Sequence, residues 1–245
     1  MKSDREPDLS LVLMFYDEEE NVVRVVGDLV STLEGAGFDF NLILVDNGSR
    51  DRTSRLIGDL TGSDPRLKKV TVKENLGLGW GVISGLSAAE GVWVGYMAGD
   101  GQVDPADVVK LLNLREERYD LIKVRRKQRQ DGFVRAWISN VYVMLLCLAF
   151  GLPFYDINAT PRIFRKKLLD RLQLKSRDWF LDAELMIKSR FLGLSVAEVP
   201  ITFLKREGGS SSVTPRTIFE FLKNIARYRF GKELREWKKE ARSRS

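Results

Sequence analysis

The sequence lacks histidine altogether and contains a single cysteine, Cys147, among its 245 residues. Without histidine, Ser-His and Cys-His nucleophilic catalysis are excluded, and so is every metal site that needs an imidazole. A metal ion would need oxygen ligands, which favours Mg²⁺ or Mn²⁺ over Zn²⁺. A single cysteine also excludes an intramolecular disulfide, in agreement with a reducing compartment.

Long apolar runs are absent as well. No uninterrupted stretch reaches the roughly 20 residues that a membrane-spanning helix needs. The longest candidate, Val141 to Leu152, has the length typical of a core helix or of a helix lying in a membrane interface. The charged segment 1–7 has no apolar centre of the kind found in secretory signals.

The composition is that of a globular protein with a substantial core, since 44% of the residues are apolar and 30% are charged. The formal charge of +6 favours an anionic partner, either a phosphate group, a membrane surface or a nucleic acid. No zinc-finger or recognition-helix signature is present, and acidic residues are mixed through the chain. A nucleic-acid partner is therefore not expected.

Apolar runs alternate with segments of helical periodicity in the first half of the chain. Strands are expected at residues 9–15, 41–46, 67–72, 92–97 and 121–124, and helices at 18–34, 51–60, 78–90 and 105–118. This alternation predicts an α/β fold with a doubly wound, mostly parallel sheet flanked by helices. Ligands of such sheets lie beyond the carboxyl ends of the strands.

The second half is less regular. Strands are expected at 156–164 and 196–203, and helices at 182–191 and 217–229, followed by a basic tail. This pattern divides the chain into a main domain, residues 1–212, and a basic C-terminal helix and tail, residues 213–245.

Two carboxylates follow predicted strands. Asp46 could accept the ring N–H of a uracil or guanine base, although the run Asn47-Gly48-Ser49 also fits a helix cap or a turn. Asp100 and Gln102 could supply oxygen ligands to a divalent ion beside a diphosphate. The alternative for Asp100 is a polar turn between two glycines.

Basic residues are concentrated between Arg125 and Arg135, and Arg206 precedes a Gly/Ser loop. Guanidinium groups can bind phosphates through two parallel hydrogen bonds. The adjacent run from Val141 to Leu152 would suit a substrate with a phosphate head and a lipid tail at a membrane surface. The alternatives are a solvated charged face and a plain core helix.

The order of these motifs resembles family 2 of the glycosyltransferases, with the GT-A fold, and within it the dolichol-phosphate mannose synthase-like transferases. The segment 14–18 resembles the family's Pro-x-Tyr-Asn-Glu, 45–53 resembles Val-Asp-Asp-Gly-Ser-x-Asp-Gly-Thr, and 75–79 resembles Asn-x-Gly-x-Gly. The resemblance implies that residues 1–124 form a nucleotide-sugar half and residues 125–212 an acceptor half. The nucleotide-binding residues that it implies are Tyr16, Glu18, Asp46, Ser49, Asn75 and Gly77.

The segment 98–105 resembles the family's Asp-x-Asp-x-Gln before a proline. It keeps Asp100 and Gln102, but Ala98 replaces the first carboxylate. The resemblance implies a Mg²⁺ or Mn²⁺ ion held by Asp100, Gln102, the diphosphate and water.

In the second half, the basic stretch from residue 126, the segment from Asp156 and the Arg206 loop resemble the acceptor side of the family. This implies catalytic roles for Asp100, Asp156 and Arg206. The acceptor phosphate would be bound by Arg126, Arg129, Arg135, Arg162 and Ser211.

The implied reaction is the inverting transfer of a sugar from a UDP- or GDP-sugar to a polyprenyl or dolichyl phosphate. One alternative is transfer to a glycan or protein hydroxyl, for which Asp156 would be the first candidate base. Another is a non-catalytic nucleotide-sugar-binding module, suggested by Ala98. We expect a peripheral protein on the cytoplasmic face of a membrane, held by Val141–Leu152 and by the tail from Lys232.

Overall fold

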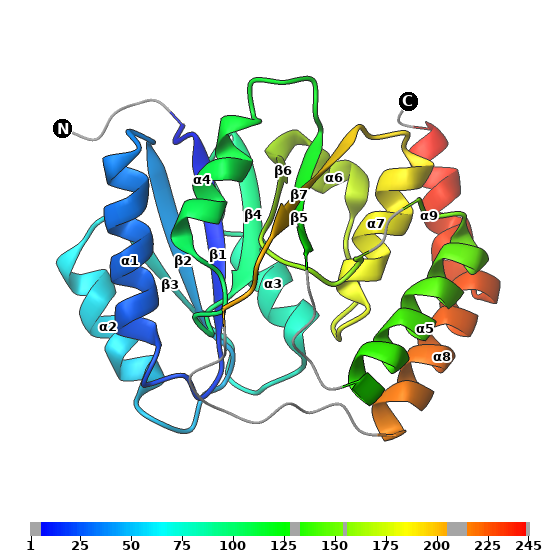
Figure 1. Ribbon diagram of the computed structural model, residues 1–245, viewed down its shortest axis with the longest axis horizontal. Helices are drawn as coiled ribbons and strands as arrows, with labels where there is room; N and C mark the ends of the chain where they lie inside the picture. Colours follow the sequence, from blue (N-terminus) through cyan, green and yellow to red (C-terminus); the bar gives the residue numbers. More distant parts are fainter. Residues whose placement is uncertain (1–5, 128–132, 154–155, 205–214, 244–245) are drawn as a thin grey trace.

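The computed structural model describes residues 6–127, 133–153, 156–204 and 215–243, leaving out the side chains of 133–140 and 215–221. Its centre is a seven-stranded sheet in the order β3-β2-β1-β4-β6-β5-β7 (Figure 1). Strand β6 pairs antiparallel with both of its neighbours, whereas the other pairs are parallel. The predicted mostly parallel α/β sheet is confirmed.

The strands are β1 (Leu9–Phe15), β2 (Phe40–Asp46), β3 (Leu67–Thr71), β4 (Trp93–Ala98), β5 (Leu121–Arg126), β6 (Arg162–Arg165) and β7 (Val196–Ile201). The helices are α1 (Val22–Gly35), α2 (Thr53–Ser63), α3 (Leu78–Leu86), α4 (Pro105–Asn113), α5 (Phe133–Phe150), α6 (Leu169–Leu172), α7 (Leu181–Phe191), α8 (Pro215–Phe230) and α9 (Lys232–Ser243).

Strand β1 is buried along its whole length and divides the core into two layers. Successive side chains of a strand point to opposite faces of the sheet. Accordingly, Leu11 and Leu13 pack with α1 and α4, whereas Val12 and Met14 pack with α3 and α7. Burial on both faces explains why the central strands appear in the sequence as continuous apolar runs.

Several predicted boundaries are wrong. The expected strand 156–164 is reduced to β6, because Asp156 to Ala159 lie in a turn and Pro161 has no N–H for strand pairing. Helix α3 ends at Leu86, short of residue 90. The basic tail is a helix, α9, whose buried stripe of Leu234, Trp237 and Ala241 is hidden in the sequence by charged neighbours.

Helix α5 starts ahead of the apolar run Val141–Leu152 and contains it as far as Phe150. Tyr142, Val143 and Leu146 are buried in the core, whereas Met144 and Leu148 are exposed. The run therefore serves as a core helix on one side and presents apolar side chains on the other. Within the described part of the chain, no helix is long and apolar enough to span a membrane.

Candidate functional site

The predicted site residues meet at one edge of the sheet. Strands β1, β2, β4 and β5 run in the same direction, so their carboxyl ends lie together, and the antiparallel β6 begins at that edge. The loops after Phe15, Asp46 and Ala98 therefore share this edge with the end of β5 and with the segment 156–161 before β6 (Figure 1).

The loops after β1 and β2 are joined by hydrogen bonds between backbone N–H groups and side chains. The N–H of Asp17 donates to Ser49 Oγ at 3.2 Å, and the N–H of Arg50 donates to Asp17 Oδ1 at 2.7 Å. The N–H of Glu18 donates to Thr53 Oγ1 at 2.9 Å. Asp17 adopts a left-handed conformation with φ of 52°, which Asp and Asn tolerate better than other residues with a side chain.

The remaining predicted nucleotide residues adjoin these loops. Asp46 is buried, and its Oδ1 accepts the N–H of Ser49 at 2.9 Å, which is the turn interaction considered as an alternative role. Asn47 Nδ2 donates to Asn75 Oδ1 at 3.3 Å, and the N–H of Gly77 donates to the same oxygen at 3.0 Å. The structure thus brings together the loops after β1, β2 and β3.

The glycines that begin α3 allow another segment to approach closely. Gly77 has a φ of 108°, and a side chain there would meet the carbonyl of Arg177. A side chain at Gly79 would meet the carbonyl of Ser176. The Arg177 carbonyl also accepts the N–H of Trp80 at 3.0 Å. These glycines thus permit close backbone packing, besides any contact with a nucleotide.

The Asp100 loop is fixed at both ends. The N–H of Gly99 donates to Met14 O at 2.8 Å, and the N–H of Gln102 donates to Asp100 Oδ1 at 3.2 Å. Gln102 Nε2 donates to Leu204 O at 3.3 Å, and the N–H of Leu204 returns a bond of 2.8 Å to Gln102 O. The loop therefore links β1 with the segment that follows β7.

The donor set at this loop fits a divalent ion that is coordinated largely by its substrate. Asp100 offers carboxylate oxygens, and Gln102 offers an amide oxygen oriented by the bond from its Nε2 to Leu204. Among the described residues, no group of three or more Asp, Glu, Cys or His side chains could hold a metal ion. Mg²⁺ commonly uses one or two protein ligands together with phosphates and water.

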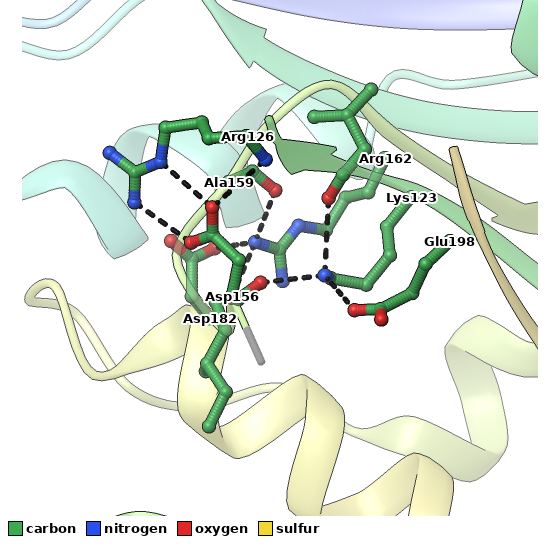
Figure 2. A network of polar contacts seen from close by, with 9 residues as sticks. Lys123, Arg126, Asp156, Ala159, Arg162, Asp182 and Glu198 are labelled. Carbon is green, nitrogen blue, oxygen red and sulfur yellow. Dashed lines mark hydrogen bonds and ion pairs between the residues drawn. The ribbon is translucent and has the colours of Figure 1, made fainter. Parts of the chain in front are cut away.

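On the other side of the edge, Asp156 forms a forked ion pair with Arg126 (Figure 2). Asp156 Oδ2 accepts Arg126 Nε at 2.8 Å and the N–H of Arg126 at 3.2 Å, while Oδ1 accepts Nη2 at 2.8 Å. The guanidinium of Arg126 also lies 5.5 Å from the ring centre of Phe203. The pair fixes the direction of an arginine at the end of β5.

Lys123 lies beneath this pair and is 0% exposed. Its Nζ donates to Asp156 O at 2.6 Å, to Val124 O at 3.1 Å and to Glu198 Oε1 at 2.8 Å. Burial lowers the pKa of Lys123, and the neighbouring charge of Arg162 acts in the same direction.

Arg162, predicted to bind the acceptor phosphate, is also 0% exposed. Its Nη2 donates to Ile157 O at 2.8 Å and to Ala159 O at 2.9 Å, and it lies 3.3 Å from Asp182 Oδ1. The structure thus places the Arg162 guanidinium inside the protein, next to Asp182, and its contact with an acceptor phosphate stays a prediction. Burial raises the pKa of Asp182, while Arg162 and the Tyr96 hydroxyl act against that rise.

No role was predicted from the sequence for four members of this network: Tyr96 and Lys123, and also Asp182 and Glu198, which begin two segments that resemble stretches of the family. The signal was available for Lys123, because a lysine within the apolar strand Leu121–Val124 must be paired if it is buried. Four other predicted residues cannot be placed. Arg129, Arg206 and Ser211 lie outside the described residues, as does the side chain of Arg135.

Comparison with known proteins identifies the family. Residues 10–176 match the profile described as Glycosyl transferase family 2. The chain belongs to this family. Because the match includes the loops after β1, β2 and β4, the resemblance seen in their motifs is confirmed.

The chain is similar to undecaprenyl-phosphate 4-deoxy-4-formamido-L-arabinose transferases. It is 26% identical to the protein of Proteus mirabilis over 219 residues, which cover 89% of this chain and 64% of that protein. Against a Pseudomonas fluorescens protein of the same name, identity is 23% over 216 residues, covering 87% and 62%. The family 2 chain thus spans less than two thirds of the length of these relatives.

Solved structures of glucosyl-3-phosphoglycerate synthase from Mycobacterium tuberculosis share the fold. The complex with phosphoglyceric acid has a TM-score of 0.70 and 20% identity, covering 90% of this chain and 79% of that one. The complex with Mn²⁺, uridine-diphosphate-glucose and phosphoglyceric acid has a TM-score of 0.71 and 19% identity, covering 92% and 80%. These likenesses confirm the predicted GT-A type of fold.

Proposed function

We propose that this family 2 chain is an inverting hexosyltransferase that moves a sugar from a UDP- or GDP-sugar to a polyprenyl or dolichyl phosphate. The observation that carries the proposal is the Asp156–Arg126 pair, which holds a guanidinium at the same sheet edge as the Asp100 loop. Such an edge can bring an anionic acceptor beside a diphosphate donor. Two relatives are named as undecaprenyl-phosphate sugar transferases, which supports a polyprenyl phosphate as the acceptor.

We assign the donor to residues 1–124 and the acceptor to residues 125–212, with residues 213–245 as a C-terminal extension. The nucleotide would contact Tyr16, Glu18, Asp46, Ser49, Asn75 and Gly77. Tyr16 is exposed at the end of β1 and could pack on a base. The joined loops support this assignment because their hydrogen bonds fix several of these residues relative to one another.

We assign Mg²⁺ or Mn²⁺ to Asp100 and Gln102. When bound, such an ion stabilises negative charge on a departing diphosphate. Arg206, outside the described residues, is proposed to add positive charge there. The fixed loop supports this assignment, since its hydrogen bonds orient the oxygens of both ligands.

Asp156 is better suited to orienting Arg126 than to acting as a general base. Its carboxylate accepts three hydrogen bonds from Arg126, which oppose the approach of a hydroxyl that must lose a proton. A phosphate acceptor is already anionic and needs little base catalysis. The hydrogen bonds between Arg126 and Asp156 therefore favour a lipid phosphate over a glycan or protein hydroxyl as the acceptor. Arg129, Arg135 and Ser211 are proposed as further contacts of that phosphate.

We propose that the outer surface of α5 and α8 binds an anionic membrane on its cytoplasmic face. Leu148 on α5 is 75% exposed and Phe230 on α8 is 72% exposed. Arg229 joins the two helices by donating from Nε to Ala149 O at 3.1 Å. Figure 1 shows α5 and α8 side by side. Apolar side chains beside basic ones are typical of a peripheral membrane surface.

An extraction assay tests the proposed reaction. The protein is incubated with a radiolabelled UDP- or GDP-sugar, Mn²⁺ and polyprenyl phosphate, and the label is then partitioned into organic solvent. We expect label in the organic phase that depends on the lipid. Transfer only to water-soluble glycans would favour the hydroxyl alternative, whereas donor binding without transfer or hydrolysis would favour a binding module.

Flotation tests the proposed membrane surface. We expect the protein to float with vesicles containing anionic lipid at low salt, and less at high salt, because screening weakens the charge contribution. Leu148→Glu should reduce flotation, whereas Val23→Glu, at an exposed position on α1, should not. Equal flotation of the two variants would count against the α5–α8 surface.

A further inference from the structure

The segment 156–161 is held by its backbone carbonyls, and both donors are buried cations (Figure 2). Lys123 Nζ donates to Asp156 O at 2.6 Å. Arg162 Nη2 donates to Ile157 O at 2.8 Å and to Ala159 O at 2.9 Å. The turn that presents the Asp156 carboxylate is therefore fixed from the inside of the protein, while Arg126 contacts it from the outer side.

Burying the Lys123 ammonium group at this position carries a large desolvation cost. A fully buried ammonium loses its hydration, and a buried ion pair often stabilises a protein no better than apolar residues of similar volume. Apolar residues at both 123 and 198 could fill most of the same space without that desolvation cost, whereas a methionine at 123 alone would leave Glu198 without its cation. Fold stability alone therefore gives little reason for a lysine here, whereas the direction of its hydrogen bonds gives a specific one.

Strand β5 holds Asp156 at two places. Lys123 binds its carbonyl oxygen, and Arg126, three residues further along the strand, binds its carboxylate. Glu198 on the neighbouring β7 fixes Lys123 through a bond of 2.8 Å. The order Glu198, Lys123, Asp156, Arg126 forms a continuous chain of contacts from the outermost strand, β7, to the loops at the carboxyl ends of the strands.

We propose that Lys123 is a positioning residue for the transfer reaction, acting through Asp156 on the orientation of Arg126. The inference rests on the proposed transferase function. Loss of Lys123 should leave the donor loops unchanged and should let the Asp156 turn relax, so that Arg126 no longer meets the acceptor phosphate at a fixed angle. Misplacing a reacting group by about 1 Å can cost on the order of 10²-fold in rate.

The test compares Lys123→Met with Lys188→Met. Lys188 is the matched control because it is 2% exposed, lies 2.6 Å from Glu184 Oε1 and donates to Gln173 O at 2.8 Å. Both variants should unfold at a lower temperature. At a temperature where both are folded, only Lys123→Met should lower kcat, by about 10- to 100-fold, with the KM for the donor unchanged.

A double-mutant cycle shows whether Lys123 acts through Asp156. In an Asp156→Asn background, Lys123→Met should lower kcat by less than about twofold, because the effects of coupled residues are not additive. Equal losses of kcat in the two lysine variants, or a full additional loss in the double variant, would overturn the proposal. Should Lys123→Met fail to fold, Glu198→Gln should give a smaller loss of the same kind, and an unchanged kcat would overturn it.

Hydrogen exchange separates this inference from the proposed function. In Lys123→Met, amides in a peptide covering residues 156–165 should exchange at least about tenfold faster than in the wild type, as expected for a local opening with a lower free energy. The same peptide should be unaffected in Lys188→Met. Absence of transferase activity in the wild type would contradict the proposed function. Unchanged amide exchange of residues 156–165 in Lys123→Met would contradict the positioning role.

Discussion

The two sides of the sheet edge are organised by different interactions. On the donor side, backbone N–H groups of one loop donate to side chains of another, as Asp17 does to Ser49 and Glu18 does to Thr53. On the acceptor side, the turn before β6 is fixed by buried cations, Lys123 and Arg162. On the first side the donors are backbone amides, whereas on the second the donors are charged side chains with no exposed area.

This difference determines how each side responds to change. A loop-to-loop hydrogen bond near the surface contributes about 0.5–1.5 kcal/mol net, because water can replace a lost partner. Removing one member of a buried ion pair leaves a charge that water cannot reach, which costs several kcal/mol. We therefore expect the donor side to tolerate single substitutions that would destabilise the acceptor side.

The largest effect is expected from Arg162→Met, which leaves Asp182 buried without its guanidinium. Chemical denaturation at pH 7 should show a loss of about 3–5 kcal/mol in the free energy of unfolding. The loss should shrink as the pH falls, because the pKa of Asp182 is already raised by burial and its protonated form carries no charge. Arg165→Met, on the same strand but only partly buried, should cost about 1 kcal/mol or less.

The same contrast explains what the sequence could predict. The donor-side loops follow directly after apolar runs, and each contains its motif within a few residues, as in Asp46-Asn47-Gly48-Ser49. The order of strands and helices predicted which of these loops meet, because parallel strands end at one edge. The sheet, the family and the position of the Asp100 loop therefore followed from the sequence.

The acceptor side could not be predicted in the same way because its contacts join distant residues. Lys123 is separated from Asp156 by 33 positions and from Glu198 by 75. Nothing in the local sequence shows whether Arg162 is buried or exposed. An arginine that binds a phosphate and one that stabilises the interior therefore cannot be told apart from the sequence. Helix α9 was missed for a related reason, because its buried Trp237 stands among charged residues.

The next effect concerns Asp100, the donor-side residue with the most direct proposed role. Asp100→Ala should lower kcat by about 10²–10³-fold, as expected when one group that stabilises developing charge is removed. It should raise the concentration of Mn²⁺ needed for half-maximal activity and leave stability nearly unchanged. Asp104→Ala, which removes the helix cap at Ala106, should cost about 1 kcal/mol in stability with activity retained. Reversed results would assign the loop a structural role.

A smaller effect is expected from Gly79→Ala, where the added carbon would meet backbone of Ser176, Arg177 and Asp178. Forcing extra volume into a packed contact typically costs about 1–3 kcal/mol. Thermal unfolding should show this loss. Gly27→Ala in α1, where the added carbon meets nothing within 4 Å, should instead stabilise the protein by about 0.5–1 kcal/mol. Equal shifts would mean that the approach of segment 176–178 is not close in solution.

The smallest effect is expected from Asp64→Asn, which tests a surface charge pair in the donor half of the chain, just before β3 and away from the site. Arg66 Nη2 lies 2.6 Å from Asp64 Oδ2, and its hydrogen bonds lower the pKa of Asp64. Asparagine can still accept the N–H of Arg66, which donates to Oδ1 at 2.9 Å, so the substitution keeps this turn and removes the charge together with the bond from Arg66 Nη2 to Oδ2. At pH 7 the loss should be about 1 kcal/mol or less.

The pH dependence gives the Asp64 prediction its sign. A lowered pKa means that the pair stabilises the fold above the unfolded value of about 3.9 and that this contribution disappears as the pH falls through the folded pKa. The unfolding free energies of wild type and Asp64→Asn should therefore converge as the pH falls below the unfolded value. A loss at pH 7 as large as that of Arg162→Met would contradict the distinction between the two sides, because a partly exposed pair would then match a buried one.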